Sequence, residues 1–336
     1  MKTTEAILQF ARYERRILRL VRQSDGLIRI RQIDYSSPSK RGLRWPIYLL
    51  EIGKKSAFRK HAPLLVSGVH GLETIGVRIH LDILSRLIDV KGRHYSPDLV
   101  AGKFGIYSIP ILNPAGVAHL TRANARGIDL NRNSGVESEK ALPFFGGHKI
   151  SRALPYFRGH TKERETRALF GFLEADFLKR RKKVHLALDI HSGYGSTNFL
   201  WWPYSYTHKP VFQQRAFESV ATQLRERHSM YRIEPMALSY QTHGDLWDAA
   251  LIDFENRVKA KKRGPQSLFL PFTLEIGTWH ELRKNPKRLF NRETIFNPPR
   301  ESRKAYLKAH RALLWDFLHL YTRRPERRVL LKANRT

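Results

Sequence analysis

The sequence alternates short apolar runs with longer amphipathic stretches, and this alternation restricts the folds that the chain can adopt. The apolar runs, which predict strands, lie at 27–37, 45–53, 62–70, 104–116, 183–193 and 267–278. The amphipathic stretches, which predict helices, lie at 5–22, 74–90, 162–179 and 209–227, after Asp245, and at 300–321. Strands that alternate with helices are typical of α/β folds, in which helices cover a parallel or mixed sheet.

One domain accounts for the whole chain, 1–336. Hydrophobic residues make up 41% of the sequence, which is ample for a large core. We expect this core to span about 25–322, after the N-terminal helix and before a basic tail at 323–336. The stretch 133–161 has weak periodicity and many Gly, Pro and aromatic residues, so we interpret it as a long ordered loop near a site.

The net charge of +31 predicts attraction to anionic polymers, such as an anionic cell wall or an acidic peptide. A basic surface with no dedicated partner is the alternative interpretation. The two basic runs, 179–183 and 259–263, contain no aromatic residues on which single-stranded bases could stack. The sequence therefore argues against nucleic acid as a specific partner.

The chain contains no cysteine, so disulfides and thiolate chemistry are excluded. Any metal must then be held by His, Asp or Glu. No apolar stretch resembles a signal peptide or approaches the ~18 residues of a membrane span. We expect a cytoplasmic protein without a membrane span; export is the alternative, because exported bacterial proteins also often lack cysteine.

Chemically distinctive residues stand where the predicted strands end. His70 and Glu73 follow the strand 63–69, His191 follows the strand 184–190, and Glu275 follows the strand 268–274. Ligands of open α/β sheets bind at the carboxyl ends of strands. Two histidines and one carboxylate are a common ligand set for catalytic zinc, which leaves a fourth position for water. Glu275 would then accept a proton from the metal-bound water.

Six motifs between 63 and 280 resemble those of the zinc carboxypeptidases in order and spacing. They are GVHGLE, NPAGV, TRANARGIDLNRN, ALDIHSG, YQTHGDLWD and TLEIGT. The motif TRANARGIDLNRN is most similar to the bacterial and cytosolic branches of the family. The resemblance implies one domain with a mixed, largely parallel, twisted sheet of about eight strands flanked by helices. It also implies one bound Zn²⁺.

The resemblance assigns roles to residues near the metal. His70, Glu73 and His191 resemble the zinc ligands, and Glu275 resembles the general base. Arg122 resembles the arginine that polarises the scissile carbonyl and stabilises the oxyanion. Loss of one such donor typically lowers the rate by roughly 10²- to 10³-fold.

Further residues resemble the family's substrate-binding groups. Asn131 and Arg132 resemble the pair that binds the terminal carboxylate, for which a planar guanidinium is well suited. Tyr240 resembles the mobile tyrosine that closes over the bound end, and a half-buried core tyrosine is its alternative interpretation. Trp247 falls where the family places the floor of the specificity pocket. Arg126 flanks the same turn as the oxyanion arginine and is the alternative for that role.

We therefore expect a zinc-dependent exopeptidase that removes the C-terminal residue of a peptide with a free terminal carboxylate, including peptidoglycan-type or modified peptides. His243 and Asp245 would recognise an amine, such as that of diaminopimelate. An amidohydrolase acting on N-acyl amino acids and a non-catalytic polyanion-binding protein are the alternatives. The stretch HTKERET, 160–166, departs from the acidic Ser-Glu-Pro-Glu segment of the family.

Overall fold

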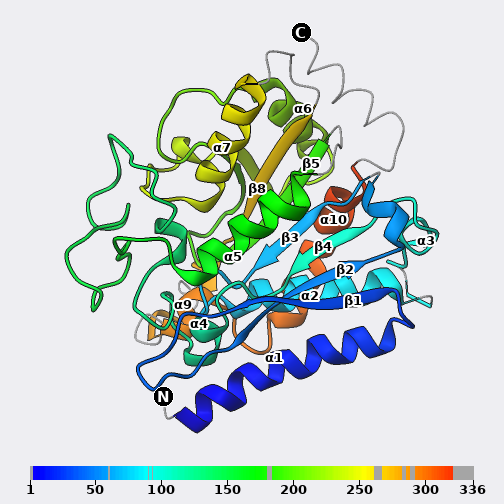
Figure 1. The fold of residues 1–336 in the computed structure, drawn as a ribbon, viewed down its shortest axis with the longest axis horizontal. Helices are drawn as coiled ribbons and strands as arrows, with labels where there is room; N and C mark the ends of the chain where they lie inside the picture. Colours follow the sequence, from blue (N-terminus) through cyan, green and yellow to red (C-terminus); the bar gives the residue numbers. More distant parts are fainter. Residues whose placement is uncertain are drawn as a thin grey trace.

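The computed structural model describes residues 3–59, 61–89, 91–92, 94–179, 184–260, 267–281, 285–287 and 292–320 (Figure 1). The predicted tail 323–336 and most of the two basic runs lie outside the described residues.

The described residues form one eight-stranded sheet, as the family resemblance implies. The strands are β1 (Ile28–Tyr35), β2 (Pro46–Ile52), β3 (Leu64–Ser67), β4 (Ile106–Ile109), β5 (Val184–Ser192), β6 (Asn198–Trp202), β7 (Tyr231–Pro235) and β8 (Leu268–Ile276). Their order in the sheet is β1-β2-β4-β3-β5-β8-β6-β7. The four middle strands, β4, β3, β5 and β8, are parallel to one another. The sheet is mixed because β2 is antiparallel to both of its neighbours, β1 and β4, and β6 is antiparallel to β8.

The burial of each strand follows its residue pattern. Every residue of β3 and of β5 is buried, in keeping with their continuous apolar runs. The edge strand β1 alternates apolar and polar residues and is only partly covered. The inner strands therefore form the core, and their ends are the rigid positions from which a site can be built.

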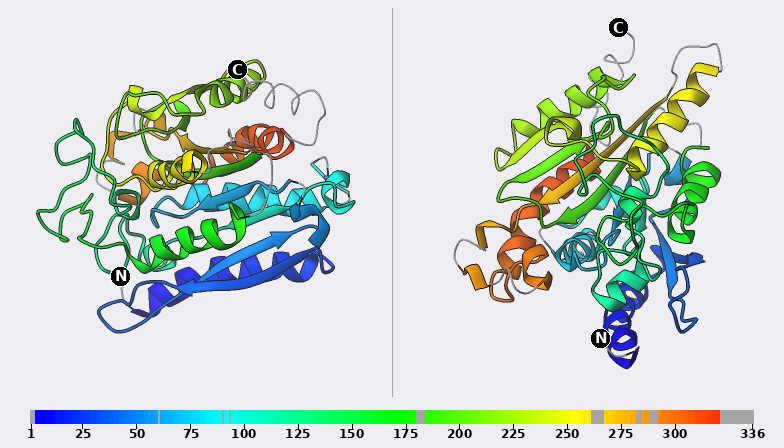
Figure 2. Two further views of the ribbon diagram at one scale, coloured as in Figure 1. Left: turned by 45° about the horizontal axis from the view of Figure 1, so that its top comes forward. Right: turned by 90° about the vertical axis from the view of Figure 1, so that its left-hand side faces the viewer.

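Helices cover both faces of the sheet. They are α1 (Thr3–Gln23), α2 (Thr74–Ile88), α3 (Pro97–Val100), α4 (Pro114–His119), α5 (Arg164–Phe172), α6 (Gln214–Arg225), α7 (Leu246–Ala260), α9 (Arg292–Phe296) and α10 (Arg303–His319). In Figures 1 and 2, α2 and α10 lie behind the sheet and α5 and α7 lie in front of it, while α1 runs along the edge formed by β1 and β2. None of the helices in the described part of the chain has the length and apolar character needed to cross a membrane.

Short turns complete the structure. They are the 3₁₀ turns η1 (Lys55–Arg59), η2 (Leu130–Arg132) and η4 (Met236–Leu238), and the π turn η3 (Leu173–Phe177) that extends α5. The stretch 133–161 contains no helix or strand, only an isolated bridge between His148 and Phe157. It is a long loop, as predicted.

Candidate active site

Three neighbouring parallel strands carry the predicted site residues to one edge of the sheet. After β3 the chain turns through His70 to Glu73, the N-cap residue of α2. The adjacent strand β5 carries His191, and the next strand, β8, carries Glu275. His191 and Glu275 are direct partners in the register of β5 and β8. The fold therefore brings together four residues that are up to about 200 positions apart in the chain.

The turn after β3 is held against α4 by close backbone packing. A Cβ on Gly71 would lie only 1.8 Å from the carbonyl carbon of Gly116, so this position accepts glycine alone. The Asn113 side chain donates from Nδ2 to the carbonyl of Val69 at 3.0 Å. Its Oδ1 accepts the amide of Gly116 at 2.8 Å and so caps α4. These contacts explain why the Asn-Pro turn accompanies the His-x-x-Glu motif: together they fix the direction of His70.

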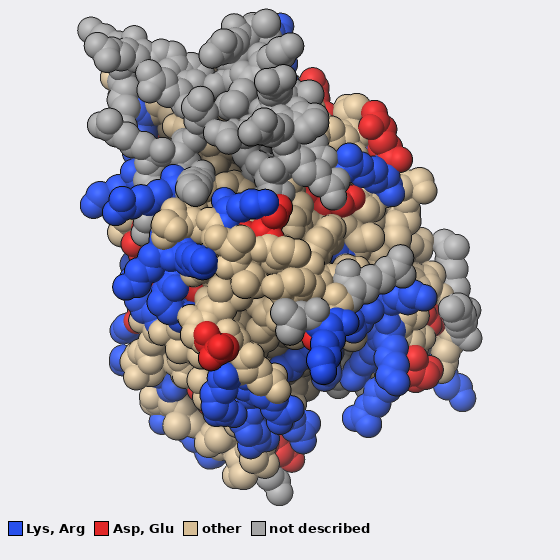
Figure 3. All heavy atoms as spheres, turned by 90° about the vertical axis from the view of Figure 1, so that its right-hand side faces the viewer, with Lys and Arg blue, Asp and Glu red and all other residues tan. Residues whose placement is uncertain are grey.

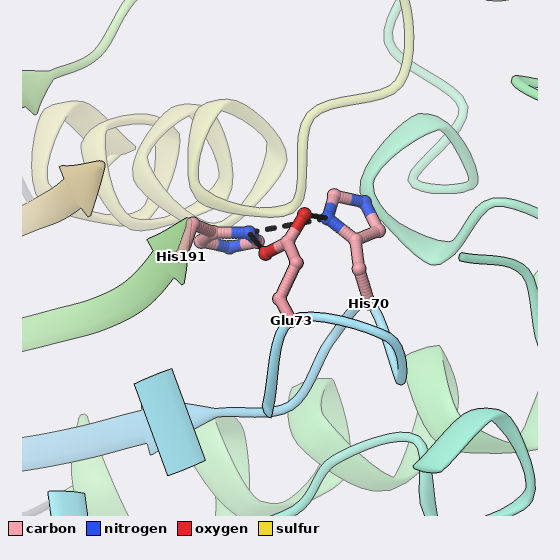
Figure 4. A group of neighbouring side chains, drawn as sticks. All are labelled: His70, Glu73 and His191. Carbon is pink, nitrogen blue, oxygen red and sulfur yellow. Dashed lines mark hydrogen bonds and ion pairs between the residues drawn. The ribbon is translucent and has the colours of Figure 1, made fainter. Parts of the chain in front are cut away.

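The side chains of His70, Glu73 and His191 point at one another (Figure 4). Nδ1 of His70 lies 2.7 Å from Oε1 of Glu73, and Nδ1 of His191 lies 3.0 Å from Oε2 of the same carboxylate. The two Nδ1 atoms are 3.2 Å apart. All three residues are buried, and one ligand atom from each lies within 4.8 Å of the others. Three potential metal ligands therefore converge on one point.

Carboxylates support both imidazoles from behind. Nε2 of His70 lies 3.1 Å from Oδ1 of Asp129, and Nε2 of His191 lies 3.0 Å from Oδ2 of Asp189. The indole of Trp247 donates to that same oxygen of Asp189 at 3.0 Å. Carboxylates in this position fix the tautomer and orientation of metal-binding histidines, so that Nδ1 is left free to bind the ion.

The electrostatics of the cluster favour a cation. Burial opposes ionisation of Glu73, but His70 and His191 hold its pKa well below the usual range. Burial likewise acts to lower the pKa of His191, but Asp189 and Glu73 raise it well above its ordinary value. Two imidazole nitrogens and a carboxylate oxygen, supported by further carboxylates, fit a zinc ion.

Arg122 borders the cluster, whereas Arg126 does not. The Arg122 Nε donates to Oδ2 of Asp129 at 2.8 Å, and its Nη1 lies 3.5 Å from Oε1 of Glu73. Burial acts to lower the pKa of Arg122, but Asp129, Tyr156 and Glu73 raise it above its ordinary value, so the guanidinium stays charged. The Arg126 side chain is 57% exposed and pairs with Glu163 at 3.6 Å. Of the two arginines, the structure places Arg122 beside the ligands.

Glu275 lies beside the converging ligands and is not one of them. It is buried, and its Oε1 accepts the backbone amide of Tyr194 at 3.0 Å. Burial, reinforced by the negative charge of Glu73, raises the pKa of Glu275 to about 8, while His191 and Arg122 act in the opposite direction. A carboxylate with a pKa near neutrality is suited to accept and return a proton.

Asn131 and Arg132 lie together in η2, two and three residues after Asp129. The Arg132 Nη1 donates to the carbonyl of Asn131 at 2.9 Å, and its Nε and Nη2 each lie 3.4 Å from the carbonyl of Phe145. Within the described residues no carboxylate pairs with this buried guanidinium. Arg132 can therefore form a direct ion pair with an anionic ligand.

The side chain of Tyr240 is half-buried among aromatic rings. Its ring packs against those of Tyr194 and Trp201, with centroids 5.2 and 6.0 Å away. Burial raises the pKa of Tyr240 to about 12, while the charge of Arg132 acts to lower this pKa and that of Glu275 to raise it. Its phenol is therefore neutral and can donate a hydrogen bond at any physiological pH.

A family model for zinc carboxypeptidases matches residues 40–299. The chain belongs to this family.

No curated protein matches the sequence. Among solved structures, bovine thrombin-activatable fibrinolysis inhibitor, in complex with a tick carboxypeptidase inhibitor, has a TM-score of 0.65 at 17% identity, over 96% of this chain and 97% of that chain. Carboxypeptidase A from Helicoverpa armigera has the same TM-score and identity, over 95% and 72%. A Pseudomonas aeruginosa metallo-carboxypeptidase, in complex with (2-guanidinoethylmercapto)succinic acid, has a TM-score of 0.50 at 18% identity, over 90% and 69%.

The enzyme is thus a metallocarboxypeptidase that uses Zn²⁺ and hydrolyses peptides. The solved structures establish the fold, and the family match establishes the class of reaction. The arrangement of His70, Glu73 and His191 is consistent with the predicted ligand roles.

Trp247, predicted as the floor of the specificity pocket, lies in the core of the carboxypeptidase. Trp247 is in the first turn of α7 and is fully buried, where it packs against Phe269 and bonds Asp189. Its contacts are those of a core residue that bonds Asp189, and its place at the floor of a specificity pocket stays a prediction.

Sequence reasoning missed Asp129, although it lies within the best-matched motif. Its Oδ1 lies near His70 and accepts the amide of Asn131 at 3.0 Å, while its Oδ2 accepts a hydrogen bond from Arg122. One carboxylate thus contacts His70, Arg122 and the turn that carries Asn131 and Arg132. Its position in the sequence, two residues before Asn131, could have marked Asp129 as a residue of the site.

Proposed function

We propose that this carboxypeptidase removes a C-terminal residue whose side chain carries an amine, from peptides with a free terminal carboxylate. Two neighbouring buried acids, Asp189 and Asp245, carry the proposal. Within the described residues, Oδ1 of Asp189 has no hydrogen-bond partner. Burial raises the pKa of Asp245, which interacts electrostatically with both Arg132 and Asp189. An ammonium group would neutralise this concentration of negative charge.

The terminal carboxylate would bind at Arg132 and Asn131. A planar guanidinium holds a carboxylate through two parallel hydrogen bonds, and no acid among the described residues forms an ion pair with Arg132. Tyr240, whose neutral phenol lies within electrostatic reach of Arg132, would donate a further hydrogen bond. Recognition of the free carboxylate accounts for removal of the last residue and for the exclusion of internal peptide bonds.

Catalysis then follows from the groups around the scissile carbonyl. His70, Glu73 and His191 would hold the zinc ion, which would supply Lewis acidity at the scissile carbonyl and at the attacking water. Glu275 takes a proton from that water and returns it to the nitrogen of the departing amino acid. Arg122, held charged and oriented by Asp129, donates to the carbonyl oxygen as negative charge develops on it.

A matched substrate series tests the proposal. Peptides that differ only in the last residue, ending in Lys, diaminopimelate, Leu or Glu, are compared by kcat/KM, together with N-acyl amino acids. We expect the amine-bearing ends to be preferred. Equal or better cleavage of the Leu or Glu peptide would contradict the preference, and faster hydrolysis of N-acyl amino acids would favour the amidohydrolase alternative.

The variant Asp245→Asn isolates the electrostatic part of this preference. Oδ1 of Asp245 accepts the amides of Trp247 and Asp248 at 2.8 and 3.0 Å at the start of α7, and the Asn carbonyl can keep both bonds. Loss of a charged hydrogen-bond partner costs about 1.5–3 kcal/mol, or roughly 10- to 100-fold in kcat/KM. The loss should fall on the amine-bearing peptides and spare the Leu peptide.

A further inference from the structure

The outward face of α1 carries a straight row of basic side chains. Arg12, Arg15, Arg19 and Arg22, which we call the arginine ridge, are all exposed. Their spacing of three, four and three residues places them on one side of the helix. The other side of α1 is buried against the domain through Phe10, Tyr13, Ile17 and Leu20. At a rise of about 1.5 Å per residue the ridge is roughly 15 Å long.

Many arginines elsewhere on the surface are paired with acids. Arg29 lies 3.4 Å from Glu51, and Arg31 lies 2.6 Å from Asp176. The ridge differs, because within the described residues no ion pair reaches any of its four members. The polar contact of its side chains is a long hydrogen bond of 3.5 Å from Arg12 to Gln9. The ridge charges are therefore left uncompensated.

The acids of α1 do not interrupt the ridge. Glu14 faces inward and accepts the phenol of Tyr48 at 2.7 Å. Glu5 lies before the ridge, and Asp25 follows the helix. Like charges three and four residues apart destabilise a helix by about 0.2–0.5 kcal/mol per pair, so the ridge costs stability instead of adding to it. A row of cations that weakens its own helix is explained by a partner that neutralises it.

We propose that the arginine ridge binds the phosphate backbone of double-stranded nucleic acid without reading its sequence. A duplex carries one negative charge per about 1.7 Å of its axis, so a ridge of roughly 15 Å lies beside more phosphates than its four guanidinium groups can neutralise. Guanidinium groups bind phosphate through two hydrogen bonds. The ridge has no aromatic side chain on which an unpaired base could stack, which favours a duplex over a single strand. Contacts to the backbone alone carry no sequence information.

Further cations extend the surface beyond the first turn of α1. Lys40, Arg41 and Arg44 are exposed in the connection between β1 and β2. The Arg41 Nη1 donates to Oγ1 of Thr3 at 2.6 Å, which fixes this connection to the start of α1. Lys40 and Arg41 also line a hollow of about 340 Å³ there. Figure 3 views the molecule from the end at which α1 finishes, and Lys and Arg side chains gather over the lower part of this face, where α1 lies.

The salt dependence of binding tests the proposal quantitatively. Affinity for a fluorescent 20-base-pair DNA duplex is measured by anisotropy between 50 and 200 mM NaCl. Four neutralised phosphates predict a slope of about −3.6 for log K against log[salt], a loss of about 150-fold over this range. The ridge is removed in a fourfold variant, Arg12→Gln, Arg15→Gln, Arg19→Gln and Arg22→Gln. The slope of log K against log[salt] should then be about 3.6 smaller in magnitude than for the wild type. Gln has nearly the helix propensity of Arg, so the fold should be kept.

A matched variant controls for net charge. Lys209→Gln, Arg215→Gln, Lys304→Gln and Lys308→Gln remove the same charge from exposed positions near α6 and on α10. We expect this control to bind the duplex with the wild-type slope. Equal losses in the two variants would overturn the proposal, because binding would then follow total charge. So would the absence of duplex binding by the wild type at 50 mM NaCl, or binding of anionic vesicles or poly-glutamate in preference to the duplex.

Folding is checked independently. The ridge variant should keep the wild-type peptidase activity and melt at the wild-type temperature or slightly above it, because its side chains are exposed and removal of like charges relieves repulsion along α1. If the fourfold variant does not fold, Arg15→Gln and Arg19→Gln are measured singly. Each should reduce the slope by about 0.9, and an unchanged slope in both would refute the assignment.

Discussion

Asp129 offers the sharpest test of how this site is held together. Its Oδ1 faces Nε2 of His70 at 3.1 Å and the amide of Asn131 at 3.0 Å, and its Oδ2 faces Nε of Arg122 at 2.8 Å. The carboxylate is thus surrounded by donors on both sides. His70 and Arg122 hold its pKa well below the usual range in spite of burial. The variant Asp129→Asn changes one oxygen into an NH₂ group at almost constant volume.

The expected loss can be worked out from these contacts. The Asn carbonyl can face either Arg122 or the pair formed by His70 and Asn131, so its NH₂ group must meet a donor on the other side. Loss of a charge-assisted hydrogen bond in a buried position costs about 1.5–3 kcal/mol, equivalent to roughly 10- to 100-fold. The same range is typical when the outer partner of a metal-binding histidine is removed. We therefore expect zinc affinity and kcat/KM each to fall by about 10- to 100-fold.

Zinc affinity is measured by competition with a chelator, and kcat/KM is measured at saturating zinc to separate metal loading from the misplacement of Arg122. Asp82→Asn is the matched control. Asp82 pairs with Arg86 and Arg311 at 3.0 and 2.7 Å, remote from the ligands, so this change should lower stability without affecting zinc. Wild-type zinc affinity together with wild-type kcat/KM in Asp129→Asn would refute the reasoning.

Three further predictions follow from the site and the core. Glu275→Gln should keep its zinc, measured by elemental analysis, while turnover falls by roughly 10²- to 10⁴-fold; a rate near wild type would remove Glu275 as the general base. Gly244→Ala places a Cβ 2.0 Å from the carbonyl oxygen of Arg132 at a φ of +71°, so KM for peptides should rise through displacement of Arg132, and an unchanged KM would contradict this. Burial lowers the pKa of His80 to about 3 and that of His310 to about 4. Both side chains stay neutral in the folded state, whereas in the unfolded chain they gain protons below about pH 6.5. The free energy of unfolding is therefore undiminished above that pH. It should fall by about 2 kcal/mol for each histidine as the pH is lowered from 6.5 to 5. In urea titrations His310→Gln should lose less stability than the wild type over this interval; equal losses would show that His310 is protonated in both states.

The central strands could be predicted because they are continuously apolar and end in distinctive residues. β6 and β7 were not among the strands expected from the residue pattern. β6 is a five-residue run, and so short an apolar segment does not distinguish a strand from a buried helix. β7 contains Arg232, Glu234 and Pro235, and it becomes a strand because it pairs with β6 at the edge of the sheet. Tertiary pairing, which no local pattern reports, decides such segments.

The same distinction applies to the polar residues. His70, Glu73 and His191 could be placed because strand ends in an α/β sheet meet at one edge. The stretch 160–166 was interpreted only as a departure from the family pattern. In the structure Glu163 and Glu165 are both buried, and Oγ of Ser37, 126 and 128 residues away in the chain, lies 2.8 Å from a carboxyl oxygen of each. Such a pairing depends on the completed fold and leaves no periodic trace in the sequence.

The alignment of β5 with β8 has a consequence for how this enzyme can vary. His191 stands opposite Glu275 because the two strands are paired residue for residue from Val184 to Ser192. Adding or deleting one residue within either strand would turn one of the two side chains to the opposite face and separate a metal ligand from its base. Changes of length are therefore tolerated in connections such as 133–161, while the length of these two strands is fixed by the chemistry.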